Sequence, residues 1–285
     1  MIAFLFYKKL MKWGIMLSTA QDLYVNKKFK KCFLNLIQLS NKMSHDVDYL
    51  DLLFKVQMKL NDQSAAIKTL DVLIHKTDSA NYLIIKMNLL MSKKLNNEAL
   101  DIGFKLQTLP LSKNIELQLF QNLTDIYIVF NDFEGVQEVL NQYVQYKTES
   151  TYHFAQGLVY IQNDDLHLAI QSLRQAVQIN PNFDQAWVTL AIMHNKMGDT
   201  ELALANIEKA LDINEQNPTA VKCYAIWKEQ AGDYSSACDK IGNYLDKNNF
   251  DQDLTMKNIE LFRKLGRNDL AFNEEVKLTY YFGHI

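Results

Sequence analysis

Glycine, proline and cysteine are scarce in this chain. Nine glycines and three prolines occur among 285 residues, fewer than a fold of many short strands and turns usually needs. The three cysteines, Cys32, Cys223 and Cys238, have neither the spacing of a metal site nor the even number of a disulfide framework. This composition favours a helical protein in a reducing compartment, and we expect free thiols packed in the core.

Motifs of catalysis and metal binding are missing as well. The glycines form no loop with the spacing that cradles a phosphate or a dinucleotide. None of the six histidines lies four residues from another histidine or beside a cysteine, so no zinc motif is present. We predict no metal ligand and no cofactor.

Charge is unevenly distributed along the chain. The net charge is −3, but residues 1–42 contain eight lysines and one acidic residue, so the start is basic and the remainder acidic. Within the basic part, Phe29 lies among four lysines, and basic residues interleaved with aromatic ones can bind nucleic acid. The four are Lys27, Lys28, Lys30 and Lys31. Because the acidic body would repel phosphate, we expect a solvated turn here and regard nucleic acid as an unlikely partner.

The N-terminal segment, residues 1–12, is apolar and basic. Its apolar run is too short to span a bilayer, which needs about 20 residues. Three interpretations remain: a cap over the end of the fold, an atypical export signal, or an anchor on a membrane surface. The anchor would use Lys8, Lys9 and Lys12.

Small residues recur with a fixed period in the second half of the chain. Alanine occurs at 169, 203, 237 and 271, and glycine at 198, 232 and 266, always 34 residues apart. A fixed period of this length indicates a solenoid of helical repeats. The same phase continues upstream with shifts of a few residues, at Val136, Ala99, Ala66 and Cys32.

Two successive units carry a recognisable pattern. The first has Gly157, Tyr160, Ala169, Leu173, Ala176 and Pro181, and the second has Trp187, Leu190, Ala191, Gly198, Ala203, Ile207 and Ala210. These residues resemble the tetratricopeptide repeat (TPR), a pair of antiparallel helices with small residues where the helices meet. His153 and His194 occupy aromatic positions of that pattern, so we expect them in the core.

The resemblance implies an all-α fold, a right-handed superhelical solenoid of about eight TPR-like helix pairs with a concave groove lined by the first helices. We expect degenerate repeats over 13–115 and TPR repeats over 116–285, with the best matches at 150–251. The periodic glycines should end first helices in a left-handed conformation, and Asp199 and Asp233 should cap the helices that follow. Since repeats account for nearly the whole chain, we predict no catalytic residue and no enzymatic activity.

The predicted function is a non-enzymatic scaffold or adaptor in the cytoplasm that binds a protein or peptide within a larger assembly. The alternative is a membrane-associated assembly or secretion factor that docks through its basic N-terminal end. A homo-oligomer is a further possibility.

By register, the groove-facing residues fall at four equivalent positions in each of three first helices. They are Phe154, Leu158, Ile161, Gln162, Val188, Ile192, Asn195, Lys196, Lys222, Ile226, Glu229 and Gln230. Some TPR proteins hold terminal carboxylates with a lysine and asparagine clamp, but Val188 and Ile192 occupy its first positions here. We therefore expect an extended or helical partner with apolar anchors, or a segment of this chain in the same place.

The C-terminal stretch is aromatic, with Tyr280, Tyr281 and Phe282. An end repeat normally has a polar outer face. The aromatic residues therefore suggest contact with a second copy or another protein, unless they fold back onto the last helix pair.

Overall fold

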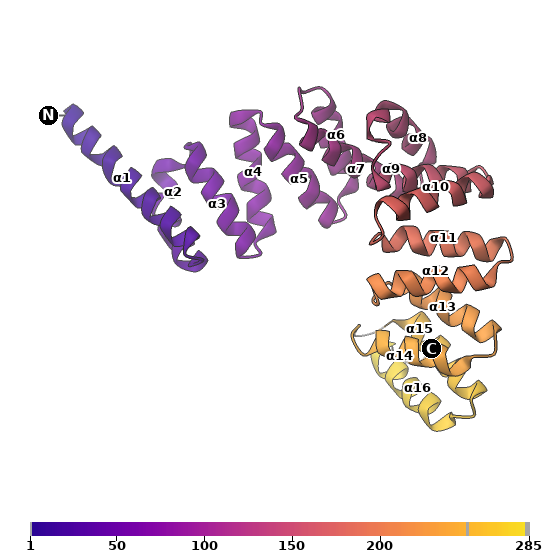
Figure 1. The fold of residues 1–285 in the computed structure, drawn as a ribbon. Helices are drawn as coiled ribbons and strands as arrows, with labels where there is room; N and C mark the ends of the chain where they lie inside the picture. The colour runs from indigo at the N-terminus through magenta and orange to yellow at the C-terminus, as the bar shows by residue number, and fades with distance from the viewer. Residues whose placement is uncertain (1, 249–250, 283–285) are drawn as a thin grey trace. The chain divides into compact units, whose positions relative to one another are not determined.

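The computed structural model describes residues 2–248 and 251–282, with side chains at 11–248 and 251–281. Within these ranges the regular structure is entirely helical, with sixteen α-helices, one short 3-10 helix and no strand (Figure 1). The predicted all-α class is confirmed. The chain divides into two compact units, with the boundary in the sequence between Phe130 and Asn131, and each is described separately.

The first unit contains seven helices. They are α1 (Ile2–Val25), α2 (Phe29–Met43), α3 (Val47–Lys59), α4 (Gln63–Thr77), α5 (Ala80–Ser92), α6 (Asn96–Gln107) and α7 (Lys113–Val129).

The second unit contains nine α-helices, with a 3-10 turn at Val144–Tyr146 after the first. They are α8 (Phe133–Gln142), α9 (Ser150–Gln162), α10 (Leu166–Ile179), α11 (Asp184–Lys196), α12 (Thr200–Ile213), α13 (Pro218–Gln230), α14 (Tyr234–Leu245), α15 (Gln252–Lys264) and α16 (Asn268–Phe282).

Helices pack in consecutive pairs within each unit. In the second unit α9 packs on α10, α11 on α12, α13 on α14 and α15 on α16, and each pair also packs on the next (Figure 1). The first unit repeats the arrangement with α1 on α2, α3 on α4 and α5 on α6. The predicted succession of helix pairs is therefore confirmed.

The periodic small residues lie where the paired helices meet. Seven of the eight are buried in the second helix of a packed pair, and the eighth, Val136, is buried in α8. The seven are Cys32, Ala66, Ala99, Ala169, Ala203, Ala237 and Ala271. A small side chain at this position lets the partner helix approach closely, which explains why the sequence keeps the period.

Every first helix is followed, two residues after its last, by a residue with left-handed backbone. Gly198, Gly232 and Gly266 have φ of 85°, 79° and 72°, as predicted. In the other repeats the equivalent residues are not glycine, yet they have the same conformation: Lys27, Asn61, Lys94, Asn131 and Asp164. The turn geometry therefore recurs even where the sequence pattern is degenerate.

Aspartate follows this turn in most repeats and caps the second helix. The carboxylate of Asp199 accepts from the N–H of Leu202 at 3.0 Å, and that of Asp233 accepts from Ser236 at 3.2 Å. Both predicted caps are confirmed, and each satisfies an otherwise unpaired donor at the helix N-terminus.

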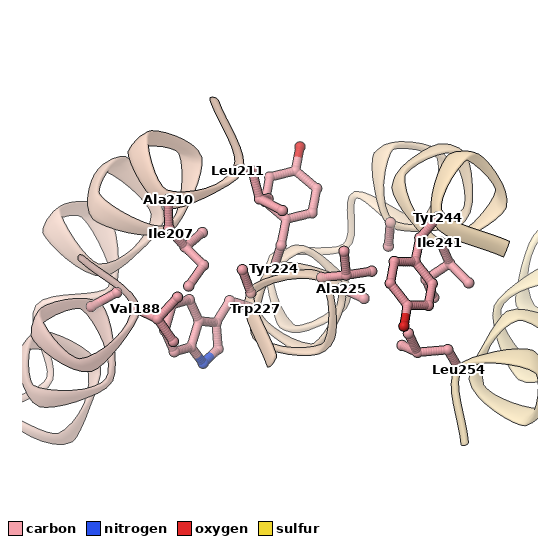
Figure 2. Close-up of a cluster of buried hydrophobic side chains, with 14 of the residues drawn as sticks. Val188, Ile207, Ala210, Leu211, Tyr224, Ala225, Trp227, Ile241, Tyr244 and Leu254 are labelled. Carbon is pink, nitrogen blue, oxygen red and sulfur yellow. The ribbon is translucent and has the colours of Figure 1, made fainter. Parts of the chain in front are cut away.

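Large side chains fill the space between successive pairs. Figure 2 shows this core in the second unit, where Ile207 and Leu211 of α12 and Tyr224 and Trp227 of α13 belong to one buried cluster. The cluster continues through α14 to Leu254 of α15. This continuous core fixes α13 and α15 on either side of α14.

The sequence-based divisions after residues 12 and 115 fall inside helices. The first lies within α1 and the second within α7. Those divisions rest on how well each stretch matches the repeat pattern, and they stay a prediction about repeat quality.

Candidate functional site

A hollow of about 460 Å³ lies between α13 and α15. It is lined on one side by Lys222 and Ile226 of α13, two of the predicted groove residues. Its other lining residues come from α15: Asp253, Leu254, Met256, Lys257 and Glu260. The hollow thus joins equivalent faces of two successive first helices.

Local sequence sets the start of both helices. Pro218 is the first residue of α13, and the side chain of Asn217 accepts from the N–H of Ala220 at 3.1 Å. At the start of α15 the carboxylate of Asp251 accepts from the N–H of Leu254 at 3.1 Å. These caps fix the helical register, so residues four apart, such as Lys222 and Ile226, share one face.

The floor of the hollow is apolar. Leu254 is buried and Ile226 is partly buried. Met256 remains 49% exposed, so its flexible thioether is free to cover an apolar group placed in the hollow. An aliphatic or aromatic side chain of a partner would find apolar contacts here.

The rim of the hollow is charged and internally paired. Lys222 Nζ lies 3.2 Å from Asp253 Oδ2 at one side. At the other side Lys257 pairs with Glu229 and, at 3.0 Å, with Glu260. Lys264 extends this network, at 2.5 Å from Glu229 and 3.1 Å from Glu260.

This network keeps its members charged. Burial alone would raise the pKa of Glu229, but hydrogen bonds from Lys257 and Lys264 outweigh it and hold that pKa below its ordinary value. The same two lysines lower the pKa of Glu260, and both glutamates raise the pKa of Lys264. At neutral pH the rim therefore carries fixed charges of both signs around an apolar floor.

Comparison with known proteins identifies the repeat. The sequence model of the tetratricopeptide repeat family matches residues 150–183 and 184–217, which contain α9–α10 and α11–α12. The chain contains tetratricopeptide repeats. The TPR pattern predicted from the sequence is therefore confirmed, and the helix pairs outside these two repeats share their fold.

Solved structures show the same fold at low sequence identity. A chain of the APC/C hetero-tetramer Cut9–Hcn1 is 11% identical, with a TM-score of 0.63, and the match covers 85% of this chain and 48% of that one. The C-terminal part of a TPR repeat-containing protein from Cytophaga hutchinsonii is 15% identical, with a TM-score of 0.53, covering 85% of this chain and 98% of that one. No curated protein is similar in sequence to this chain.

Two of the predicted groove residues are core residues of these TPR helices. Val188 is 5% exposed and belongs to the same buried cluster as Trp227 (Figure 2). Phe154 is 8% exposed, and its ring centroid lies 4.8 Å from that of Phe183. Both are corrected from groove residues to packing residues, because neighbouring aromatic rings cover them.

The other predicted residues of α9 and α11 remain on the surface of their TPR helices but outside the hollow. Leu158, Ile161, Ile192 and Asn195 are partly buried, whereas Gln162 and Lys196 are exposed. On α13, Glu229 belongs to the rim network and Gln230 is exposed. Of the twelve predicted residues, the structure brings Lys222 and Ile226 into the hollow.

The α15 half of the hollow is missing from the sequence prediction. Met256 and Glu260 lie 34 residues after Lys222 and Ile226, so the repeat period places them at the same positions one TPR later. Extending the register into the last, weakly matching repeat would have found them.

Of the residues predicted to pack in the core, His194, Cys32 and Cys238 are buried, whereas His153 and Cys223 are only partly buried. His194 Nε2 lies 3.4 Å from Arg174. Burial and the positive charge of Arg174 lower the pKa of His194, so its ring is neutral at pH 7. The three cysteines are free thiols, and among the described residues no cluster of histidine, cysteine and acidic side chains could hold a metal ion.

The roles predicted for residues at the two ends of the chain stay predictions. None of the described helices has the length and apolar character needed to cross a bilayer. Lys12 is exposed, whereas the side chains of Lys8 and Lys9 lie outside the described residues. Tyr280 and Tyr281 are both exposed on α16, and the side chain of Phe282 lies outside the described residues.

Proposed function

We propose that this TPR chain is a non-enzymatic scaffold that binds a segment of another protein in the hollow between α13 and α15. The observation that carries the proposal is the combination of an apolar floor, at which Met256 is exposed, with a rim of paired charges. In this role the chain would act as an adaptor or assembly factor in the cytoplasm.

The hollow favours one chemistry of partner. A single aliphatic or aromatic side chain would fill the floor and remove Ile226 and Met256 from water, which supplies most of the affinity. The rim contributes two lysines and two carboxylates, Lys222, Lys257, Asp253 and Glu260, so its net charge is zero. We therefore expect binding that changes little with salt, unlike that of a strongly acidic or basic peptide.

The fold comparison supports this class of function. The APC/C hetero-tetramer Cut9–Hcn1 contains a chain with the same fold inside a multiprotein assembly. For the present chain, a place in such an assembly is part of the proposal.

Peptide selection tests the proposed site. A random dodecapeptide library displayed on phage should yield sequences that share one aliphatic or aromatic anchor when selected on the full chain. The Met256→Glu variant should lose these peptides, because a charged side chain would enter the apolar floor. Met197→Glu is the matched control: Met197 is 46% exposed, much like Met256, but lies outside the hollow.

Three results would argue against the proposal. The first is a selection that yields no shared anchor residue. The second is a shared anchor whose peptides the Met256→Glu variant still binds. The third is equal loss with Met197→Glu, which would indicate a general effect of added charge. Far-UV circular dichroism would confirm that both variants keep their helices.

Docking at a membrane surface remains the alternative proposal. It would use Lys8, Lys9 and Lys12 with the exposed side chains of Met11 and Ile15. Sedimentation with vesicles that contain anionic phospholipid tests it. A chain that does not sediment, or that sediments equally after Lys8, Lys9 and Lys12 are replaced by glutamine, removes this alternative.

A further inference from the structure

The first helix has an uncovered apolar face. Ile15 on α1 is 66% exposed, and Met11, four residues earlier on the same face, is exposed too. The residues at the position of Ile15 in the other seven first helices are buried, except for partly buried Tyr82. They are Tyr49, Tyr82, Leu119, Tyr152, Ala186, Ala220 and Leu254.

The last helix has a complementary uncovered face. Phe272 on α16 is 63% exposed, and Val276 and Tyr280 follow at four-residue spacing, so the three form one apolar stripe. Cys238 occupies the position of Phe272 on α14, and it is buried because α15 packs against α14. No described helix packs in this way against the stripe on α16.

These two faces are the two halves of one type of interface. In the second unit, Cys238 of α14 lies in the buried cluster that also contains residues of the first helices α13 and α15, and its equivalent Leu204 of α12 packs against that cluster. Phe272 lies on the equivalent face of α16, at the end of the second unit. Val276 and Tyr280 extend the apolar stripe beside it, since the equivalent residues of α14, Gly242 and Asp246, are not covered by α15. In the other first helices, the face equivalent to that of Ile15 packs against the preceding helix pair.

Charge favours joining the two helices. Helix α1 carries Lys8, Lys9 and Lys12 with one acid, Asp22, for a net charge of +2. Helix α16 carries three acids and one lysine, for a net charge of −2: Asp269, Glu274, Glu275 and Lys277. Opposite charges would attract the two helices and disfavour pairing of like ends.

We infer that the stripe of Phe272, Val276 and Tyr280 on α16 binds the Met11–Ile15 face of α1 in a second copy of this chain, which continues the stacking of pairs from one molecule into the next. The contact is head to tail, so every oligomer keeps one free face at each of its two ends. Assembly is therefore open-ended. This inference goes beyond peptide binding, since α1 and α16 contribute no residue to the hollow.

Two blocked variants test the inference. Ile15→Glu removes the accepting face of α1, and Phe272→Glu removes the stripe on α16. Both side chains are mostly exposed, so the helices should persist, as circular dichroism and thermal melting would show. In sedimentation velocity over a range of concentrations, wild type should form growing oligomers, and each variant alone should remain monomeric, with self-association weakened at least ~10-fold.

The decisive sample is an equimolar mixture of the two variants. Each retains the face that the other lacks, so the mixture should form a one-to-one dimer and stop there. Val129→Glu is the matched control, because Val129 is equally exposed but lies on α7, and it should associate like wild type.

Other outcomes would overturn the inference. A wild-type chain that stays monomeric at millimolar concentration contradicts it directly. An Ile15→Glu variant that dimerises alone would show that two α16 stripes meet each other instead. If glutamate unfolds a variant, the serine substitutions Ile15→Ser and Phe272→Ser allow the same mixing test.

Discussion

Lys94 and Gly198 occupy the same left-handed turn position in two different repeats, with φ of 61° and 85°. Glycine adopts this conformation without a steric penalty, whereas a side chain at positive φ is strained. The same fold therefore tolerates a residue that the local backbone disfavours.

Replacing Lys94 by glycine should stabilise the protein. The strain at this position is relieved, so the free energy of unfolding should rise by about 1 kcal/mol. Urea unfolding followed by circular dichroism measures the change. Lys93→Gly is the control: Lys93 has an ordinary φ of −91°, and glycine there should give no gain.

A new cap at the start of α2 should also stabilise the fold. Lys28 is the residue before α2, is exposed and provides no capping hydrogen bond. Lys28→Asp places a carboxylate where Asp199 caps α12, and we expect a gain of about 1 kcal/mol in unfolding free energy. Lys28→Ala separates the two effects, since it removes the positive charge without adding a cap. An equal gain in both variants would contradict the capping account.

The buried amide of Asn258 weakens the last repeat. This residue of α15 is buried, and its Oδ1 accepts no hydrogen bond from the residues that the structure describes. Leucine at this position should raise the unfolding free energy by about 1 kcal/mol or more, because an unpaired polar atom is removed from the core. Leu190→Asn is the reciprocal variant at the same position of α11, and it should cost a few kcal/mol. A destabilised Asn258→Leu variant would indicate that the amide has a specific partner in solution.

The rim network should make the stability of the fold depend on pH in the acidic range. Glu229 and Glu260 have pKa values lowered in the folded state, so they stabilise the fold above the pKa of an unfolded glutamate. That stability is lost as the pH falls through the lowered values. The thermal midpoint of wild type should therefore fall below about pH 4.5, and that of Glu229→Gln should fall less steeply. Parallel pH profiles for both proteins would contradict this account.

Sequence periodicity predicted the helix pairs because small residues are required wherever two helices touch. Ala169 and Ala203 reveal the phase because a small side chain at this position lets the paired helices approach closely. The left-handed turns at Lys27 and Lys94 were not predicted, because lysine, unlike glycine, does not indicate a positive φ. Their position follows only from the period, once the repeat is extended into its degenerate half.

The candidate site was only partly predictable. Register predicts Lys222 and Ile226 on one face of α13, and both line the hollow. It failed for Phe154 and Val188, since exposure at that position depends on which neighbours cover it, and Phe183 and the cluster around Trp227 do so here. The charge pairs from Lys257 and Lys264 to Glu229 join two repeats, and no single repeat contains their signal.

Hydrogen–deuterium exchange with a selected peptide tests the central proposal most directly. The full chain should be compared with and without a saturating dodecapeptide from the library. Exchange should slow in α13 and α15, over 218–230 and 252–264, with little change in α9 to α12. Protection confined to α9 to α12, or to the first unit, would contradict a binding site in the hollow between α13 and α15.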